Sequence, residues 1–286
     1  MIVPDRGFGV STHLFHDRRL TREDVVDVAA HGFELIELFA TRSHFDYRDP
    51  AAIAELQEWL GDTHVALHSV HAPVMEAMRA GQWVGSFSIA SGDDTRRKAA
   101  VAEAEAALAI ASSIPFQFLV VHVGVPIGQK IPPGDNQPDA ARRSVIEIVE
   151  AAAHLNVRVA LEVMPNPLSG AASLVQTLED QLEGVNVGIC LDYGHANLMT
   201  DAAEAAETVS GHLWTTHLHD NNGKRDDHLV PYAGTINWDE AMMATQKIGY
   251  EGALMFEVGS NGAEPVDVLK RIAKARERLD KTFVTF

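Results

Sequence analysis

The sequence predicts an α/β protein, a (β/α)8 TIM barrel that forms a single domain over residues 1–286. Short apolar runs alternate with longer amphipathic stretches through eight cycles, which indicates parallel strands joined by crossover helices. The length of 286 residues is near the ~250 that such a barrel usually takes. Many of the apolar runs also end in a carboxylate or an imidazole, as expected where the carboxyl ends of parallel strands surround one mouth.

Each strand is expected where a short apolar run is bounded by polar or turn residues. In chain order the expected strands are residues 8–13, 34–39, 65–71, 116–122, 157–163, 187–192, 212–219 and 253–258. The amphipathic stretches between them predict helices near residues 21–31, 50–60, 95–112, 138–154, 171–182, 199–209, 237–248 and 264–280. An open, doubly wound sheet is the alternative, but ligands at the ends of so many strands favour a closed barrel.

Local signals mark where several helices begin and end. The segments Thr21-Arg-Glu-Asp and Asn237-Trp-Asp-Glu resemble capping boxes that begin helices. Gly32 and Gly249 stand where the preceding helices should end. The longest connections all follow strands, on the face of a barrel where active sites form, and they are residues 73–94, 124–137 and 220–236.

Composition excludes several classes of protein. The net charge of −17 repels a phosphate backbone, so a small-molecule substrate is favoured and no nucleic-acid partner is expected. Cys190, the single cysteine, lies in an apolar run and is expected in the core. No signal-like segment begins the chain, and no apolar stretch reaches the ~18 residues of a membrane span. We therefore expect a cytoplasmic protein with no membrane partner, and a homo-oligomer is left open.

Four of the predicted strands end in Glu162, Asp192, His219 and Glu257. Side chains alternate along a strand, and each of these four falls on the less bulky face, the expected interior of the barrel. His219 shares this face with His217. Carboxylate and imidazole suit Mn²⁺, Mg²⁺, Co²⁺ or Zn²⁺ rather than a metal selected by thiolates. We expect the four side chains to bind one divalent cation.

The same residues suggest a reaction. A divalent cation with open positions can bind adjacent oxygens of a sugar and stabilise an enediolate. Removal of a proton next to a carbonyl needs a base on one face of the substrate and an acid on the other. Glu162 and Glu257 come from strands separated around the ring. We expect these two glutamates to be the catalytic pair and metal ligands at the same time.

Three histidines lie near these ligands. His71 and His122 end the third and fourth strands, and His195 follows Asp192 by three residues. Histidine is a frequent substrate-binding and metal-binding residue at such a mouth. We expect the three to orient substrate hydroxyls or, at a site with several cations, to bind a further ion.

Four other polar residues complete the set of candidates. Asp226 and His228 lie in the long connection after the seventh strand and are candidates for a further ion, although no parity argument applies to a loop. His13 and Glu37 lie at the ends of the first two strands with inward parity. We expect His13 and Glu37 to contact substrate.

Two stretches carry a resemblance to a known family. They are the run from His217 to His228, with the sequence His-Leu-His-Asp-Asn-Asn-Gly-Lys-Arg-Asp-Asp-His, and the segment Leu191-Asp-Tyr-Gly-His. On these motifs the chain resembles the xylose isomerase-like TIM-barrel superfamily of sugar phosphate isomerases and epimerases, which also contains endonuclease IV. The likeness covers nearly the whole chain, and it implies a barrel enzyme that acts on a small carbohydrate.

The resemblance to the ketose 3-epimerases of this superfamily implies roles for individual residues. The glutamates matching Glu162 and Glu257 exchange the substrate proton there, and the positions matching His195 and Arg225 hold substrate hydroxyls. A substrate-binding glutamate of those enzymes falls here on Leu168, so we expect substrate binding to differ. The positions that bind their single metal match Glu162, Asp192, His219 and Glu257.

The resemblance to endonuclease IV implies a different metal site. Its three zinc ions are bound at positions that match His71, His122, Glu162, Asp192, His195, His219, Asp226, His228 and Glu257. A site with several ions therefore stays open. The net charge of −17 and the few basic residues in the loops of the active face argue against DNA as the substrate.

The sequence thus predicts a metal-dependent isomerase or epimerase of a small sugar, with Mn²⁺ as the first expected metal and Zn²⁺ as the second. A lyase or dehydratase that acts on a cyclic polyol or keto-sugar is the next alternative. A phosphodiesterase of the endonuclease IV type is the third. A metal-stabilised binding protein without catalysis would require the inward carboxylates to be purely structural.

Overall fold

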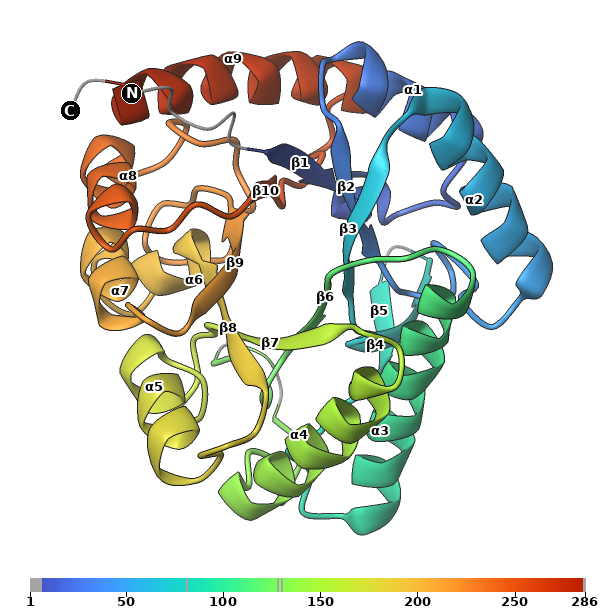
Figure 1. Cartoon of the computed structure of the whole chain (residues 1–286), viewed down its shortest axis with the longest axis vertical. Coiled ribbons are helices and arrows are strands. Elements are labelled where there is room, and N and C mark those ends of the chain that lie inside the picture. Colours follow the sequence, from blue (N-terminus) through green and yellow to red (C-terminus); the bar gives the residue numbers. More distant parts are fainter. Residues whose placement is uncertain (1–6, 81, 128, 130, 285–286) are drawn as a thin grey trace.

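The computed structural model describes residues 7–80, 82–127, 129 and 131–284. Eight parallel strands close into a barrel with the helices on its outside, as Figure 1 shows, so the predicted fold class is confirmed. The predicted domain also includes residues 1–6 and 285–286, which lie outside the described residues. The barrel strands are β1 (Phe8–Ser11), β2 (Leu35–Phe39), β3 (Ala66–His71), β6 (Phe118–Val121), β7 (Arg158–Glu162), β8 (Val187–Asp192), β9 (Leu213–Leu218) and β10 (Leu254–Phe256).

The strands follow one another around the barrel in chain order, and β10 pairs with β1 to close it. One helix or more lies between each strand and the next barrel strand. The main helices are α1 (Arg22–Ala30), α2 (Pro50–Thr63), α3 (Asp94–Leu108), α4 (Pro138–Ala153), α5 (Ala171–Asp180), α7 (Ala202–Thr208), α8 (Trp238–Lys247) and α9 (Pro265–Val284). Shorter helical segments are α6 (Tyr193–Asn197) and the 3-10 helices Thr12–Phe15 and Ala109–Ser112.

The predicted helix signals are present at both capping segments. The backbone N–H of Thr21 donates to the Asp24 carboxylate at 2.9 Å, and the Asn237 side chain accepts from the backbone of Glu240. Gly32 and Gly249 have φ angles of 82° and 75°, the left-handed conformation that ends a helix.

The barrel strands separate two apolar regions. Val120, Ala160 and Cys190 form a small cluster of their own in the interior, which confirms the inward parity of their strands and the core position of Cys190. Ile189 and Leu191 point to the other side of β8 and belong to the large core between strands and helices. Near the carboxyl ends of the strands, the barrel interior contains buried polar side chains, among them Glu162, Asp192 and His217.

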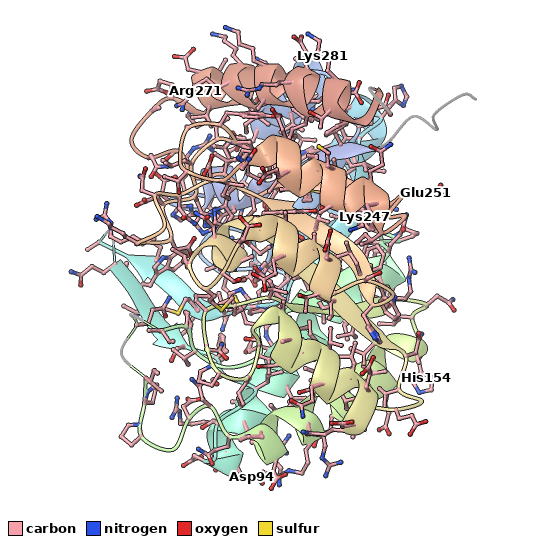
Figure 2. All side chains as sticks on the ribbon, turned by 90° about the vertical axis from the view of Figure 1, so that its left-hand side faces the viewer. Asp94, His154, Lys247, Glu251, Arg271 and Lys281 are labelled. Carbon is pink, nitrogen blue, oxygen red and sulfur yellow. The ribbon has the colours of Figure 1, made fainter. Side chains whose placement is uncertain are left out.

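A two-stranded antiparallel hairpin lies within the connection of residues 73–94, where only a long loop was expected. Its strands are β4 (Met75–Arg79) and β5 (Gln82–Ser86). In Figure 2 the hairpin projects, in cyan, on the side opposite His154 and Glu251, which precede β7 and β10. The hairpin therefore lies on the face where the strands end. Among the described residues, no helix is long and apolar enough to cross a bilayer.

Candidate metal centre

Six ligand-type side chains lie where barrel strands end. His71, Glu162 and Asp192 are the last residues of β3, β7 and β8. His122, His219 and Glu257 come directly after β6, β9 and β10. Since all eight strands are parallel, these side chains meet at one mouth of the barrel, as expected from the sequence.

The central group of donors consists of Glu162, Asp192, His217 and Glu257, whose ligand atoms all lie within 4.8 Å of one another. All four residues are buried, and Glu257 is the most exposed at 3%. His217 Nδ1 lies 3.4 Å from Glu162 Oε1, 3.4 Å from Glu257 Oε2 and 3.9 Å from Asp192 Oδ2. The group has the size and the donors of a single divalent-cation site.

The imidazole that lies within this central group is that of His217, while His219, the predicted ligand, contacts the group through Asp192. Both side chains point inward from β9, so alternation alone does not distinguish them. The strand register does, because His217 pairs with Asp192 on one side and with Met255 on the other. His219 lies two residues further, about 7 Å along the strand direction. Its ring remains 3.0 Å from Asp192 Oδ1 but joins a different group.

A second group shares Glu162 with the first. His71 Nε2 lies 3.1 Å and His122 Nε2 lies 3.0 Å from Glu162 Oε2. The two imidazole nitrogens are 3.2 Å apart. Because the other oxygen of Glu162 faces the central group, Glu162 is a candidate ligand in both groups.

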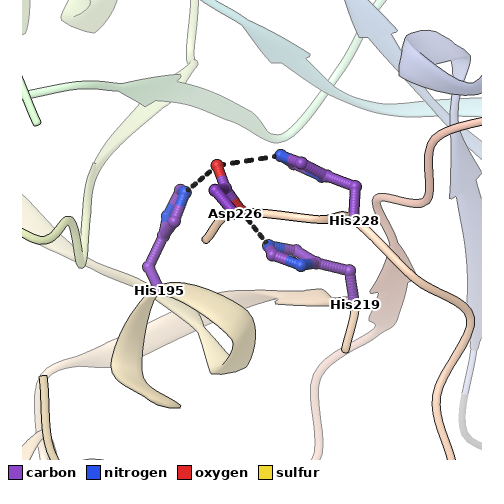
Figure 3. A group of neighbouring side chains, drawn as sticks. All are labelled: His195, His219, Asp226 and His228. Atoms are coloured by element: carbon purple, nitrogen blue, oxygen red, sulfur yellow. Dashed lines mark hydrogen bonds and ion pairs between the residues drawn. The ribbon is translucent and has the colours of Figure 1, made fainter. Parts of the chain in front are cut away.

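The third group, drawn in Figure 3, consists of His195, His219, Asp226 and His228. Asp226 stands between the imidazoles, with Oδ2 3.1 Å from both His195 Nε2 and His228 Nε2. Its Oδ1 lies 3.7 Å from His219 Nε2. The loop residues Asp226 and His228 are thus brought to the mouth by the fold of the connection after β9.

That connection is held by Asp220. Its backbone exchanges two hydrogen bonds with Leu229, and its carboxylate accepts from the Trp238 indole at 2.9 Å. Gly194 is equally necessary, because a Cβ there would lie 2.0 Å from the His219 ring. The glycine of the Asp-Tyr-Gly-His segment therefore makes room for an imidazole. Asp192 Oδ1 accepts from the backbone of His195 at 2.7 Å and so fixes the start of α6.

The carboxylates in the mouth of the barrel are paired with imidazoles. Among the described residues, no lysine or arginine pairs with Glu162, Asp192 or Glu257. Burial favours a raised pKa for Glu162, but the charges of His122 and His217 outweigh it and hold the pKa well below the usual range. Burial is the main reason why the pKa of Glu257 is raised.

The carboxylates in turn shift the pKa values of the imidazoles. Burial alone would lower the pKa of His71, but hydrogen bonding and attraction to Glu162 raise it to about 9. Asp226 likewise overcomes burial and raises the pKa of His228 to about 10. His122 differs, because burial outweighs its attraction to Glu162 and its pKa is lowered.

The donor set fits a divalent cation. The three groups contain only imidazoles and carboxylates, the ligands of Mn²⁺ and Zn²⁺ sites. The imidazole nitrogen His219 Nδ1 is buried without a hydrogen-bond partner. The central group is rich in carboxylates, which suits Mn²⁺, and the third group is rich in histidine, which suits Zn²⁺.

A cavity of about 360 Å³ opens above these groups. His71, His122, His195 and Glu257 reach it from the barrel, whereas Glu162, Asp192 and Glu37 are not among the residues that line it. His13 lines the cavity too, although it lies in the 3-10 helix after β1 and not on the strand as expected.

Two residues predicted to bind substrate lie elsewhere. The Arg225 side chain is 84% exposed and pairs with Asp227 at 3.3 Å, and it is not among the residues that line the cavity. Arg225 lies in a loop, where the alternation of side chains along a strand does not indicate the direction of a side chain. Glu37 is fully buried beneath the mouth, where it hydrogen-bonds to Ser69 and His217. Its inward parity was correct, but it lies too far down the strand to line the cavity.

The hairpin forms an aromatic wall that the sequence analysis missed. Trp83 lines the cavity, and its ring lies 5.4 Å from the His16 ring and 6.2 Å from the Phe39 ring between centroids. A tryptophan in a polar connection between two barrel elements is the one signal that could have indicated this wall.

Comparisons with known proteins agree with this geometry. A family model described as xylose isomerase-like TIM barrel matches residues 25–282. The "Uncharacterized protein MJ1311" of Methanocaldococcus jannaschii is 30% identical over 262 residues, which cover 89% of this chain and 84% of that protein. A D-psicose 3-epimerase of Enterocloster bolteae is 33% identical over 135 residues, 43% of this chain and 41% of that enzyme. Among solved structures, a D-tagatose 3-epimerase-like protein has a TM-score of 0.76 and 26% identity, with 96% of this chain and 98% of that chain covered.

Proposed function

The chain belongs to the xylose isomerase-like TIM barrel family, and on this basis we propose that it is a divalent-metal-dependent isomerase or epimerase of a small sugar or sugar derivative. The observation that carries the proposal is the central group, in which Glu162 and Glu257 approach one imidazole from strands on different sides of the mouth. The names of the two epimerase relatives support the same reaction class.

Glu162, Asp192 and Glu257 would hold the cation together with an imidazole of β9 or the residue after it, His217 or His219, with Mn²⁺ as the first candidate and Zn²⁺ as the second. When bound, a divalent cation draws electron density from a carbonyl and the neighbouring hydroxyl, which makes the C–H next to the carbonyl more acidic. His219 is the predicted imidazole ligand, and it lies 3.0 Å from Asp192 Oδ1, whereas the nearest approach of His217 to Asp192 is 3.9 Å.

The proton is handled by the two glutamates. Glu257 lines the cavity and is the first candidate for the base that takes the proton from carbon. Glu162 lies deeper and returns a proton from the other side, which inverts the centre in an epimerisation. In an isomerisation, one carboxylate moves the proton to the adjacent carbon.

The remaining histidines would orient the sugar. His71, His122, His195 and His13 line the cavity and can donate to or accept from hydroxyl groups. Of the described residues that line it, none is lysine or arginine, the side chains that usually hold a phosphate. This favours an unphosphorylated sugar.

A second candidate, a phosphodiesterase with three metal ions, is favoured by one specific observation. The donors form three groups, and Glu162 is shared by two of them. The absence of lysine and arginine among the described lining residues, together with the net charge of −17, argues against a nucleic-acid substrate.

Activity on defined substrates tests the proposal. Protein stripped with a chelator and reloaded with Mn²⁺ or Zn²⁺ is incubated with a panel of free aldoses and ketoses, and products are separated by chromatography. We expect interconversion of at least one pair of sugars, lost with the chelator and restored by metal. Cleavage of abasic DNA, with no activity on sugars and three zinc ions per chain, would favour the second candidate instead.

A further inference from the structure

A cavity of about 580 Å³ opens at the end of the barrel where the strands begin. Its lining includes the first residues of β2, β6, β7 and β9, which are Leu35, Phe118, Arg158 and Leu213. Glu251 also lines it, and in Figure 2 this residue lies on the side opposite the hairpin. No residue of the three donor groups reaches this cavity, so it is separate from the candidate metal centre.

Two irregularities of strand register place side chains in this cavity. The pairing between β2 and β3 skips His68, and the pairing between β8 and β9 skips Trp214. The strands β3 and β9 lie opposite each other in the barrel, and both skipped residues line the cavity. An extra residue of this kind redirects a side chain, and such bulges are frequent at the rims of barrels and beside functional sites.

Trp214 and Arg158 form one wall of the cavity. A Cβ at Gly188 would lie 2.2 Å from the Trp214 ring, so this glycine makes room for the indole. The Arg158 guanidinium lies over the Phe118 ring at 4.3 Å and over the Trp214 ring at 5.3 Å. Arg158 forms no ion pair or side-chain hydrogen bond with a described residue, so its N–H groups are available to a ligand.

His68 adds a buried polar group to the cavity, because only 5% of its surface is exposed. Its Nε2 lies 3.4 Å from Thr215 Oγ1, which is long for a hydrogen bond, and its Nδ1 has no hydrogen-bond partner among the described residues. Burial is the main reason why the pKa of His68 falls to about 4. The neutral imidazole has one N–H that it can donate to an acceptor in the cavity.

We propose that this cavity is a binding site for a small organic carboxylate, whose charged group is held by Arg158 and His68. The apolar part of the ligand lies against the rings of Phe118 and Trp214. A guanidinium presents parallel N–H groups that match the two oxygens of a carboxylate. Glu251 lines the same cavity and the net charge is −17, so a doubly charged phosphate is disfavoured relative to a singly charged carboxylate.

Closure of the barrel end does not by itself account for these side chains. The contact with two aromatic rings explains where the Arg158 guanidinium lies, but it leaves the N–H groups without acceptors. Apolar side chains would close the barrel by dense packing, without a buried imidazole that lacks a strong partner. A ligand that accepts from both groups removes this cost.

Isothermal titration calorimetry of the full-length protein with benzoate tests the inference. We expect saturable binding with the same affinity in the presence and absence of a divalent cation, since the cavity is separate from the donor groups. Benzamide, which lacks the charge, should bind about 10-fold more weakly or worse. Inorganic phosphate is the second anion, and tighter binding of phosphate than of benzoate would overturn the assignment of a carboxylate.

Variants locate the binding site. We expect Arg158→Gln to bind benzoate about 10-fold to 100-fold more weakly. Arg143→Gln, which changes an exposed arginine of α4 in the same way, is the control and should keep the wild-type affinity. If Arg158→Gln does not unfold cooperatively, Arg158→Lys replaces it, because lysine keeps the charge but lacks the paired N–H groups. An unchanged affinity in the Arg158 variant, or binding that requires the divalent cation, would overturn the inference.

Discussion

Glu257 is the carboxylate of the central group that a substrate can reach, because it lines the cavity while Glu162 and Asp192 lie below. We predict that Glu257→Gln lowers kcat about 10²-fold to 10⁴-fold, the usual contribution of a positioned acid or base. Steady-state kinetics on the interconverted sugar pair measures this. The exposed Glu264→Gln variant, changed in the same way, should retain the wild-type rate.

An unchanged kcat in Glu257→Gln would contradict its role as the base. The free energy of unfolding of both variants should be compared with the wild type, so that a loss of folded protein is not counted as a loss of catalysis.

His44 is a buried histidine outside the metal groups. Its Nδ1 is 2.7 Å from the Arg18 carbonyl, and its Nε2 has no hydrogen-bond partner. Burial lowers the pKa of His44 to about 4. An unfolded chain has a histidine pKa near 6.5, so below that pH it binds more protons than the folded protein. The stability from neutral His44 is complete above pH ~6.5 and is lost as the pH falls toward 4.

We predict that acidification from pH 7.5 to pH 5 lowers the free energy of unfolding by about 2 kcal/mol through His44 alone. Urea unfolding of the wild type and of His44→Gln at both pH values measures it. The variant should show the smaller loss on acidification, and an identical pH dependence in the two proteins would contradict a neutral, buried His44.

The alternation of side chains along a strand does not predict whether His217 or His219 lies level with Glu162, Asp192 and Glu257. Alternation along a strand places both side chains inside the barrel, and it correctly indicates inward positions for Glu162, Asp192 and Glu257. It does not give the level along the barrel axis, which depends on the register between strands. A single sequence contains no direct signal for that register.

At the scale of elements, the barrel strands were predictable because each is a short apolar run between polar segments. The hairpin of β4 and β5 was not, since its strands are only partly buried and lack a clear alternation of apolar residues. Its position depends on tertiary contacts, such as the Met78 backbone to the Ser43 hydroxyl at 2.9 Å and the Trp83 ring on His16.

Trp83 gives this hairpin a testable role. We predict that Trp83→Ala raises KM about tenfold with little change in kcat, because the ring forms a wall of the cavity and does not reach the central group. Gln82→Ala, an exposed position on the same strand, is the control and should leave KM unchanged. An unaltered KM in Trp83→Ala would show that the hairpin does not contact substrate.

At the scale of the whole molecule, the net charge supports the proposal of an uncharged substrate. The protein carries a net charge of −17, and the described residues that line the cavity include Asp226, Asp227 and Glu257 but no lysine or arginine. We predict that kcat/KM for a free sugar exceeds that for its phosphate ester at least tenfold. Competition between the two forms in one assay measures the ratio directly, and a preference for the ester would contradict the assignment of an uncharged substrate.

The barrel, its closure and the three donor groups support one central claim, that this protein moves a proton between substrate carbon and a carboxylate with the help of a divalent metal. Incubation of the metal-loaded enzyme with its sugar in heavy water, followed by mass spectrometry and NMR of the product, tests this claim most directly. The account predicts one deuterium on the carbon next to the carbonyl, with incorporation abolished by a chelator and strongly reduced in Glu257→Gln. Product formed at the normal rate without any deuterium in the sugar, and without dependence on metal, would contradict it.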